Sequence, residues 1–169
     1  MVKYTSAIVI PARIGSTRLP NKLLIDIAGK PMISWVIEAA LKVDFKAEVI
    51  VATDDNRIKK VSEGYGAFSV ITDSKHPSGS DRIAEAAETL KIADNHIVVN
   101  LQGDEPLMPS SIITKIAELK YDFPDISVTT AATRIKNKSE LDNSNSVKVI
   151  LNCHSEAIYF LIPLRLYPP

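Results

Sequence analysis

Short apolar runs alternate with amphipathic segments from Ala7 to Leu119. The apolar runs predict buried strands at residues 7–10, 48–52, 67–71 and 97–101. The segment after each run carries apolar residues at helical spacing, which predicts a helix. Alternating strands and helices are typical of α/β proteins with a mostly parallel, doubly wound sheet, and this is the fold class we expect.

Particular residues mark where the predicted helices begin. Pro31 stands at the start of the first helix, where proline is favoured. Residues 53–55 can cap the second helix, and Ser78 with Asp81 has the spacing of a capping box before the third. The fourth helix opens at residues 109–111 and is expected to turn three apolar residues inward: Ile112, Ile116 and Leu119.

The pattern changes in the C-terminal part of the chain. Residues 126–133 are β-branched and predict a strand. Residues 143–146 predict a loop, and the apolar runs at 147–151 and 156–160 predict a β-hairpin after it. Residues 161–169 contain three prolines and match neither the helical nor the strand period.

Length and composition suit one domain with a buried core. The chain has 169 residues, of which 46% are hydrophobic, so we expect a single domain over residues 1–169. Twenty basic residues balance twenty acidic ones, so no net field favours nucleic acid or an anionic membrane as a partner. No run approaches the ~18 apolar residues of a membrane helix. A single cysteine, Cys153, excludes an internal disulfide and agrees with a cytoplasmic location.

Cations are concentrated between Pro11 and Lys22, directly after the first predicted strand. This stretch combines two arginines, a lysine, a glycine and two hydroxyls: Arg13, Arg18, Lys22, Gly15, Ser16 and Thr17. Ligands of open parallel sheets bind beyond the carboxyl ends of the strands, and arginine and lysine suit phosphate oxygens. The stretch matches neither the Walker P-loop nor the G-x-G-x-x-G fingerprint. We interpret it as a loop that binds a nucleoside triphosphate. Spacing alone leaves a solvated basic loop as the alternative.

A second polar group follows the predicted strand at 97–101. Asp104 would lie at the same sheet edge as the basic stretch, where a carboxylate beside a triphosphate calls for a bridging Mg²⁺; an ordinary acidic turn is the alternative. Gln102 either binds substrate hydroxyls or hydrogen-bonds the turn. For Ser80 and Arg82, helix capping and a surface charge are the interpretations that physics alone favours. The three histidines lack the spacing of a metal site or of a nucleophile's base.

Several motifs stand in order along the chain: Pro-Ala-Arg at 11–13, Ser-Thr-Arg-Leu-Pro at 16–20, Gly-Lys-Pro-Met-Ile at 29–33, Val-Ala-Thr-Asp at 51–54, Ser-Gly-Ser-Asp-Arg at 78–82, Val-Asn-Leu-Gln-Gly-Asp-Glu-Pro at 99–106, and Asn-Ser-Val-Lys-Val at 145–149. Together they resemble the 3-deoxy-manno-octulosonate cytidylyltransferases, the CMP-Kdo synthetase family, over roughly residues 7–160. CMP-sialic acid synthetases share Pro-Ala-Arg, but the turn at 102–106 is more similar to the Kdo enzymes.

The resemblance implies a nucleotide-diphospho-sugar transferase fold, which is a three-layer, Rossmann-like α/β sheet with a C-terminal β-hairpin. It implies that the anomeric hydroxyl of Kdo attacks the α-phosphate of CTP, giving CMP-Kdo and pyrophosphate for lipopolysaccharide assembly. Arg13 and Lys22 would stabilise charge on the phosphates, Asp104 would hold Mg²⁺, and the backbone of Ala12 and Arg13 would seat cytosine. Arg13, Lys22 and Asp104 are the expected catalytic residues.

The resemblance also implies further substrate-binding residues. Ser16 would add hydroxyl and amide donors, Arg18 and Gln102 would contact the sugar acid or the triphosphate, and Ser80 with Arg82 would close over the nucleotide. Transfer to another acid sugar, as in CMP-sialate synthesis, or to a sugar phosphate is an alternative. A non-catalytic nucleotide-binding remnant is another.

The chain departs from the family after Phe160, where residues 161–169 replace a longer family segment. That segment normally carries a second metal-binding aspartate, sugar-binding residues and much of the homodimer contact. We therefore expect a domain that is incomplete at its C-terminus, with a weak Mg²⁺ site, a weakened homodimer and little or no formation of CMP-Kdo.

Overall fold

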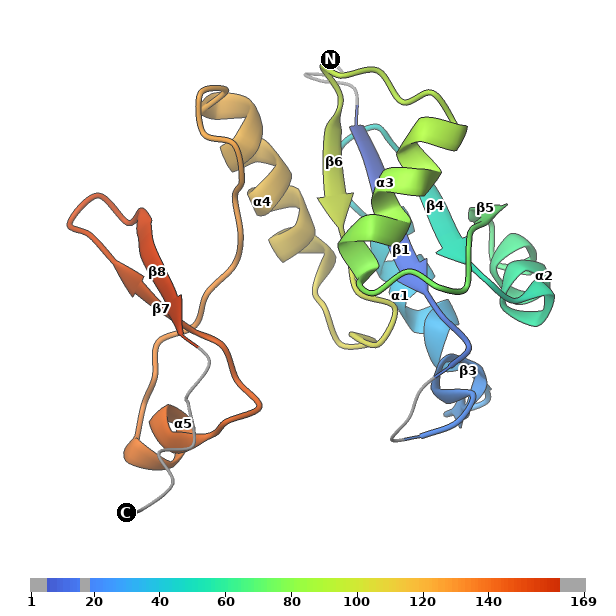
Figure 1. Ribbon diagram of the computed structural model, residues 1–169, viewed down its shortest axis with the longest axis horizontal. Coiled ribbons are helices and arrows are strands. Elements are labelled where there is room, and N and C mark those ends of the chain that lie inside the picture. Colours follow the sequence, from blue (N-terminus) through green and yellow to red (C-terminus); the bar gives the residue numbers. More distant parts are fainter. Residues whose placement is uncertain (1–5, 16–18, 162–169) are drawn as a thin grey trace. The chain divides into compact units, whose positions relative to one another are not determined.

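Four parallel strands form the sheet around which the first part of the chain is built (Figure 1). The computed structural model describes residues 6–15 and 19–161, and the chain divides into two units between Thr129 and Thr130. The strands of the first unit are β1 (Ser6–Ala12), β4 (Ala47–Thr53), β5 (Phe68–Ile71) and β6 (Ile97–Asn100). They lie in the order β5-β4-β1-β6, and every pairing is parallel. The expected α/β fold with a parallel sheet is confirmed.

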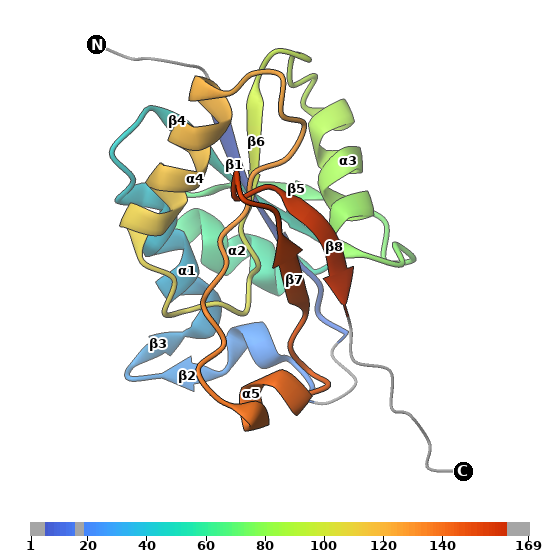
Figure 2. The ribbon, with the colours of Figure 1, turned by 90° about the vertical axis from the view of Figure 1, so that its left-hand side faces the viewer.

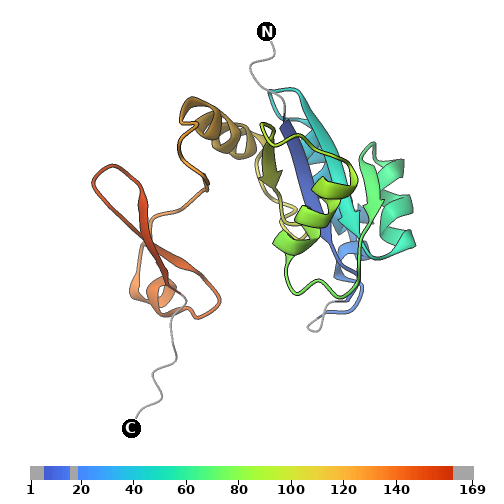
Figure 3. The ribbon, with the colours of Figure 1, turned by 45° about the horizontal axis from the view of Figure 1, so that its top comes forward.

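Helices cover both faces of this sheet (Figures 1 and 3). One face packs against α1 (Met32–Leu41), α2 (Asn56–Gly64) and α4 (Ser110–Asp122). The other face packs against α3 (Gly79–Thr89). A 3-10 turn, η1 (Lys22–Leu24), and a short hairpin of β2 (Asp26–Ile27) and β3 (Lys30–Pro31) lead into α1 (Figure 2).

The alternation of side chains along β1 explains this layering. Ile8 and Ile10 are fully buried on the face that packs against α1, in the same core cluster as Ile33. Ala7 and Val9 point to the opposite face and pack with α3. A strand buried on both faces is typically a continuous apolar run, and β1 is apolar from Ala7 to Ala12. Burial of each isoleucine contributes about 1.5–3 kcal/mol.

Two of the predicted helix starts are stabilised by side chains. Ser78 is the N-cap of α3, where its Oγ accepts a hydrogen bond from the Asp81 amide. Asp55 is the N-cap of α2 and accepts from the amides of the two residues that follow Asn56. Pro31 precedes α1 as its N-cap residue instead of occupying the first helical position. The sequence signals therefore place each start within one residue.

The predicted inward face of α4 is wrong. Ile113, Thr114 and Ala117 are the buried residues of this helix, whereas Leu119 is 44% exposed. One step along a helix rotates the side chain by about 100°, so a stripe chosen one residue away points largely elsewhere. Packing against β6 and α1 selects the stripe that contains Ile113.

The described part of the second unit, residues 130–161, contains one short helix and a hairpin. They are α5 (Lys138–Asp142) and the antiparallel pair β7 (Lys148–Leu151) and β8 (Ala157–Leu161). The predicted C-terminal hairpin is therefore confirmed. Lys148 is buried, and its Nζ donates to the carbonyls of Asn143 and Ser146, which holds the loop before β7.

The strand predicted at residues 126–133 is wrong, because the structure assigns no strand there. β-branched residues favour extended backbone, but a strand also needs a partner for its ladder. The hydroxyl of Thr129 instead donates to the carbonyl of Ile116 on α4, 3.0 Å away. Within the described residues, no helix is long and apolar enough to cross a membrane.

Candidate functional site

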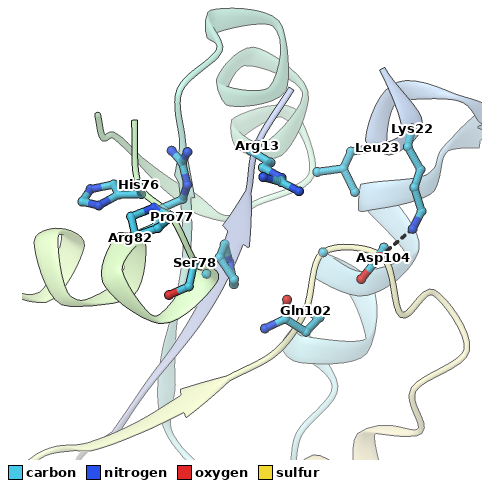
Figure 4. A pocket seen from close by; sticks show the side chains of 12 residues that line it. Arg13, Lys22, Leu23, His76, Pro77, Ser78, Arg82, Gln102 and Asp104 are labelled. Atoms are coloured by element: carbon cyan, nitrogen blue, oxygen red, sulfur yellow. Dashed lines mark hydrogen bonds and ion pairs between the residues drawn. The ribbon is translucent and has the colours of Figure 1, made fainter. Parts of the chain in front are cut away.

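A pocket of about 260 Å³ lies at the carboxyl ends of β1 and β6. The order of the sheet reverses between these two neighbouring strands, and doubly wound sheets bind ligands at such a reversal. In Figure 4, His76, Pro77 and Ser78 lie on one side of the pocket, with Lys22 and Asp104 on the other. The lining residues come from four segments: Pro11, Arg13, Lys22, Leu23, His76, Pro77, Ser78, Gly79, Arg82, Gln102, Gly103 and Asp104.

The segment after β1 brings two of the predicted phosphate ligands to this pocket. Arg13 and Lys22 both line it, whereas Ser16 and Arg18 lie outside the described residues. Lys22 begins the turn η1, and the next residue, Leu23, is buried in the main core. The anchored Leu23 fixes the backbone from which the lysine side chain reaches the pocket.

An ion pair joins Lys22 to the segment after β6. Its Nζ lies 2.5 Å from Oδ2 of Asp104, and the two side chains are 32% and 46% exposed (Figure 4). Exposed ion pairs contribute only about 0–1 kcal/mol. A polyphosphate that enters the pocket can therefore draw Lys22 away from Asp104 at little cost.

The amino end of α3 forms another wall of the pocket. Ser78 Oγ accepts from the amide of Asp81 at 3.2 Å and donates to its carboxylate at 2.6 Å. Gly79 permits a close approach, because a Cβ there would lie 3.2 Å from Cγ of Pro11. The free amides and the dipole at a helix start favour an anion. This wall thus offers amide donors to an anion near Arg13, while the Asp81 carboxylate in the first turn offsets part of the helix dipole.

His76 lines the pocket although the sequence assigns it no role. Its Nε2 pairs with Oε2 of Glu85 on α3, and the same oxygen accepts from the Asp73 amide at 2.9 Å. The hydrogen bond from His76, helped by that amide, holds the pKa of Glu85 below its ordinary value. The pair fastens the loop before α3 to the helix itself. One feature of the sequence indicates that His76 lies near the site: it stands two residues before the N-cap Ser78, at the sheet edge that carries the basic stretch.

Arg82 is buried, so its interpretation as a surface charge is wrong: the residue is 2% exposed. Its Nη1 donates to Oγ1 of Thr72 at 2.5 Å, and Nη2 lies 3.3 Å from Oδ2 of Asp54. Arg82 lines the pocket while protein groups hold its guanidinium in place. Ser80 is exposed on α3 and does not occur among the described residues that line the pocket.

The segment after β6 forms the remaining wall. Gln102 lines the pocket, and its Nε2 donates to Oδ1 of Asn100, the last residue of β6, at 2.7 Å. At Gly103 a Cβ would lie 3.1 Å from the carbonyl oxygen of Pro11, which shows how closely β6 and β1 approach. Ala12 is fully buried at the end of β1, and its side chain is not among the described lining residues.

Asp104 offers one carboxylate to a metal ion. The pKa of the adjacent Glu105 is raised, because its carboxyl is partly desolvated and lies beside the charge of Asp104. No group of three or more His, Cys, Asp or Glu that could hold a metal occurs in the described part of the chain. Mg²⁺ binds through one or two carboxylates plus substrate phosphates. Asp104 therefore fits Mg²⁺ as a single protein ligand beside a bound polyphosphate.

The amino-acid sequence matches the family model of the cytidylyltransferases over residues 7–162. A 3-deoxy-manno-octulosonate cytidylyltransferase of Coxiella burnetii is 50% identical over 153 residues, which cover 90% of this chain and 61% of that relative. The enzyme of the same name from Polynucleobacter asymbioticus is 48% identical over 153 residues, with 90% and 60% covered. The chain thus spans about 60% of the length of the curated relatives it matches.

The fold is similar to the folds of a solved synthetase and a solved cytidylyltransferase. The structure of CMP:2-keto-3-deoxy-manno-octonic acid synthetase complexed with CTP has a TM-score of 0.81 and 37% identity, covering 97% of this chain and 66% of that one. A cytidylyltransferase from Leptospira borgpetersenii has a TM-score of 0.59 and 28% identity, covering 70% and 49%. The similarity thus extends from the sequence motifs to the backbone.

Proposed function

The chain belongs to the cytidylyltransferase family, and we propose on this premise that its pocket binds CTP for the transfer of a cytidylyl group to Kdo. The observation that carries the proposal is the convergence of Arg13, Lys22 and the amino end of α3 on one pocket at the carboxyl ends of β1 and β6. The names of the relatives and the CTP complex of a similar synthetase support the choice of nucleotide and sugar.

The proposed reaction is an in-line displacement at phosphorus. The anomeric hydroxyl of Kdo gives up its proton to water and forms a bond to the α-phosphorus of CTP, while the bond to the bridging oxygen breaks and pyrophosphate leaves. Such transfers depend on positioning and charge neutralisation more than on a covalent protein nucleophile. Arg13 and Lys22 neutralise the phosphate oxygens, and the amides at the start of α3 offer further donors.

Asp104 is the candidate carboxylate ligand for Mg²⁺ in the described pocket. The ion, when bound, would offset the negative charge of the triphosphate and of the departing pyrophosphate. Lys22 pairs with Asp104 in the structure. When Asp104 binds a metal ion, the Lys22 ammonium must therefore leave the carboxylate and pair with the phosphates instead. Gln102, which also lines the pocket, would contact the sugar acid or the triphosphate.

Titration calorimetry with Mg²⁺ and CTP, UTP or ATP tests which nucleotide the pocket binds. An assay of pyrophosphate release tests which sugar accepts the cytidylyl group. We expect CTP to bind about tenfold or more tightly than UTP, because a site that hydrogen-bonds one base leaves groups unpaired with another. Any release of pyrophosphate should require both CTP and Kdo. The variant Arg13→Ala should weaken binding of all three nucleotides, since the side chain of Arg13 is assigned to phosphate.

Two results would contradict the proposal. Equal affinity for CTP and UTP would contradict the proposal that the pocket selects CTP. Pyrophosphate release with N-acetylneuraminate in place of Kdo would remove the assignment of the sugar.

A further inference from the structure

The carboxylate of Asp54 joins two segments that line the pocket, although Asp54 is not among the described lining residues. It directly follows β4, and its side chain is 8% exposed. Oδ1 accepts a hydrogen bond from the amide of Ile14 at 3.0 Å, and Oδ2 lies 3.3 Å from Nη2 of Arg82. One carboxylate therefore ties the segment that carries Arg13 to helix α3.

Arg82 extends this connection to a third strand. Its side chain is 3% exposed, and Nη1 donates to Oγ1 of Thr72 at 2.5 Å. Thr72 follows β5, and its amide donates to the carbonyl of Thr53, the last residue of β4, at 2.9 Å. The four residues Ile14, Asp54, Thr72 and Arg82 are called the Asp54 clamp below. The clamp joins the ends of β1, β4 and β5 to the first turn of α3.

Stability alone does not account for a buried pair of this kind. Removing a carboxylate and a guanidinium from water offsets much of their attraction, and packed apolar residues of similar volume are often equally stabilising. The pair also fixes the relative position of two segments, because the two oxygens of Asp54 have partners on different segments. Since Asp54 neutralises Arg82, the positive charge that an anion meets comes from Arg13 and Lys22.

We propose that Asp54 is a positioning residue of the nucleotide site. It holds Arg13 and the amino end of α3 at the separation at which both contact the same polyphosphate. It acts through the backbone of Ile14, which is bonded to Arg13, and through Arg82, three residues after Gly79. This inference rests on the proposed function and names a residue on which the geometry of that site depends, without contact between Asp54 and the ligand.

Three variants separate positioning from general stability. Asp54→Ala removes both contacts of the carboxylate, whereas Asp54→Asn keeps an oxygen for the Ile14 amide and loses the charge opposite Arg82. The matched control is Asp55→Ala. Asp55 is the next residue, accepts backbone amides and pairs with an arginine, Arg57. It caps α2 and does not line the described pocket.

Two measurements are made on each folded variant: calorimetric titration with inorganic tripolyphosphate, CTP and UTP, and hydrogen exchange of the Ile14 amide. Asp54→Ala leaves the Arg82 guanidinium without its carboxylate, which by itself favours an anion. If positioning dominates, the variant should nevertheless weaken tripolyphosphate binding by about tenfold or more, the loss expected when a charge-assisted contact no longer orders its partner. It should also speed exchange of the Ile14 amide. Asp54→Asn should weaken binding by a smaller factor with near-normal exchange. Asp55→Ala should bind within about twofold of the unaltered chain, although it melts at lower temperature.

Binding by Asp54→Ala within twofold of Asp55→Ala would overturn the inference, and so would a failure of the unaltered chain to bind tripolyphosphate. If Asp54→Ala does not fold, Asp54→Asn is compared with Asp55→Asn under the same criterion. A loss of affinity in the Asp54 variants together with equal binding of CTP and UTP would overturn only the proposed function. A normal preference for CTP without any effect at Asp54 would overturn only the inference.

Discussion

Replacing Gly103 by alanine tests how closely the end of β6 must approach β1. A Cβ at this position would lie 3.1 Å from the carbonyl oxygen of Pro11 and 3.5 Å from both methyl carbons of Leu23. The Leu23 methyls are at ordinary contact distance, but the Pro11 oxygen belongs to the backbone of a buried strand and cannot swing aside. The two chain segments must therefore separate by a few tenths of an ångström.

The cost of this separation follows from the contacts. Overpacking a close-packed site costs about 1–3 kcal/mol, and a single tight contact places Gly103→Ala at about 1–2 kcal/mol. For a chain of this size, that lowers the Tm by roughly 2–8 °C. Because Leu23 anchors Lys22 beside the pocket, the same shift moves the lysine, and we expect CTP affinity to fall by about threefold to tenfold.

Thermal unfolding followed by circular dichroism and calorimetric titration with CTP measure the two effects. Gly64→Ala is the control, since Gly64 ends α2 and a Cβ there would meet no atom within 4 Å. Alanine is favoured over glycine in helices by about 0.5–1 kcal/mol, so this variant should be as stable as the unaltered chain or more so. A Gly103→Ala variant with unchanged Tm and CTP affinity would refute the close approach of β6 and β1.

Three further changes probe the core, the loop before α3 and the metal. Ile113→Ala should cost about 2–5 kcal/mol in a denaturant titration, because Ile113 is fully packed; a loss no larger than that of the half-buried Ile112→Ala would contradict the observed face of α4. Since the hydrogen bond from His76 lowers the pKa of Glu85, its stabilisation is present above the ordinary glutamate pKa of 4.5 and is lost as the pH falls through the lowered value. The stability difference between the unaltered chain and Glu85→Gln should therefore shrink in acid, and a difference independent of pH would speak against the pair. Asp104→Asn should abolish the increase in CTP affinity on adding Mg²⁺, measured by calorimetry with and without EDTA; an undiminished Mg²⁺ effect would exclude Asp104 as the ligand.

The elements of the sheet could be predicted because their signals are local. The apolar run of β1 and the spacing of Ser78 and Asp81 depend only on neighbouring residues, so each marks its element without knowledge of the fold. The placement of Arg13 beside Gln102 in one pocket follows from a general rule, since parallel strands bring their carboxyl ends to one edge.

The remaining features depend on contacts between distant parts of the chain. Arg82 is buried because Thr72 and Asp54, 10 and 28 residues away, accept its hydrogen bonds. No pattern around Arg82 itself indicates those partners. The inward face of α4 likewise depends on which neighbours the helix meets. Residues 126–133 have strand propensity, but propensity does not supply a partner strand.

Backbone amide NMR during a titration of the chain with CTP and Mg²⁺ tests the central claim most directly. If the pocket at the carboxyl ends of β1 and β6 is the nucleotide site, the largest shifts will fall on Arg13, Lys22, His76 and residues 78–82 and 102–104. The same titration of Lys22→Ala should need higher CTP concentrations to reach the same shifts. Shifts confined to β7 and β8, or no shift in the segments that line the pocket at saturating CTP, would contradict the claim.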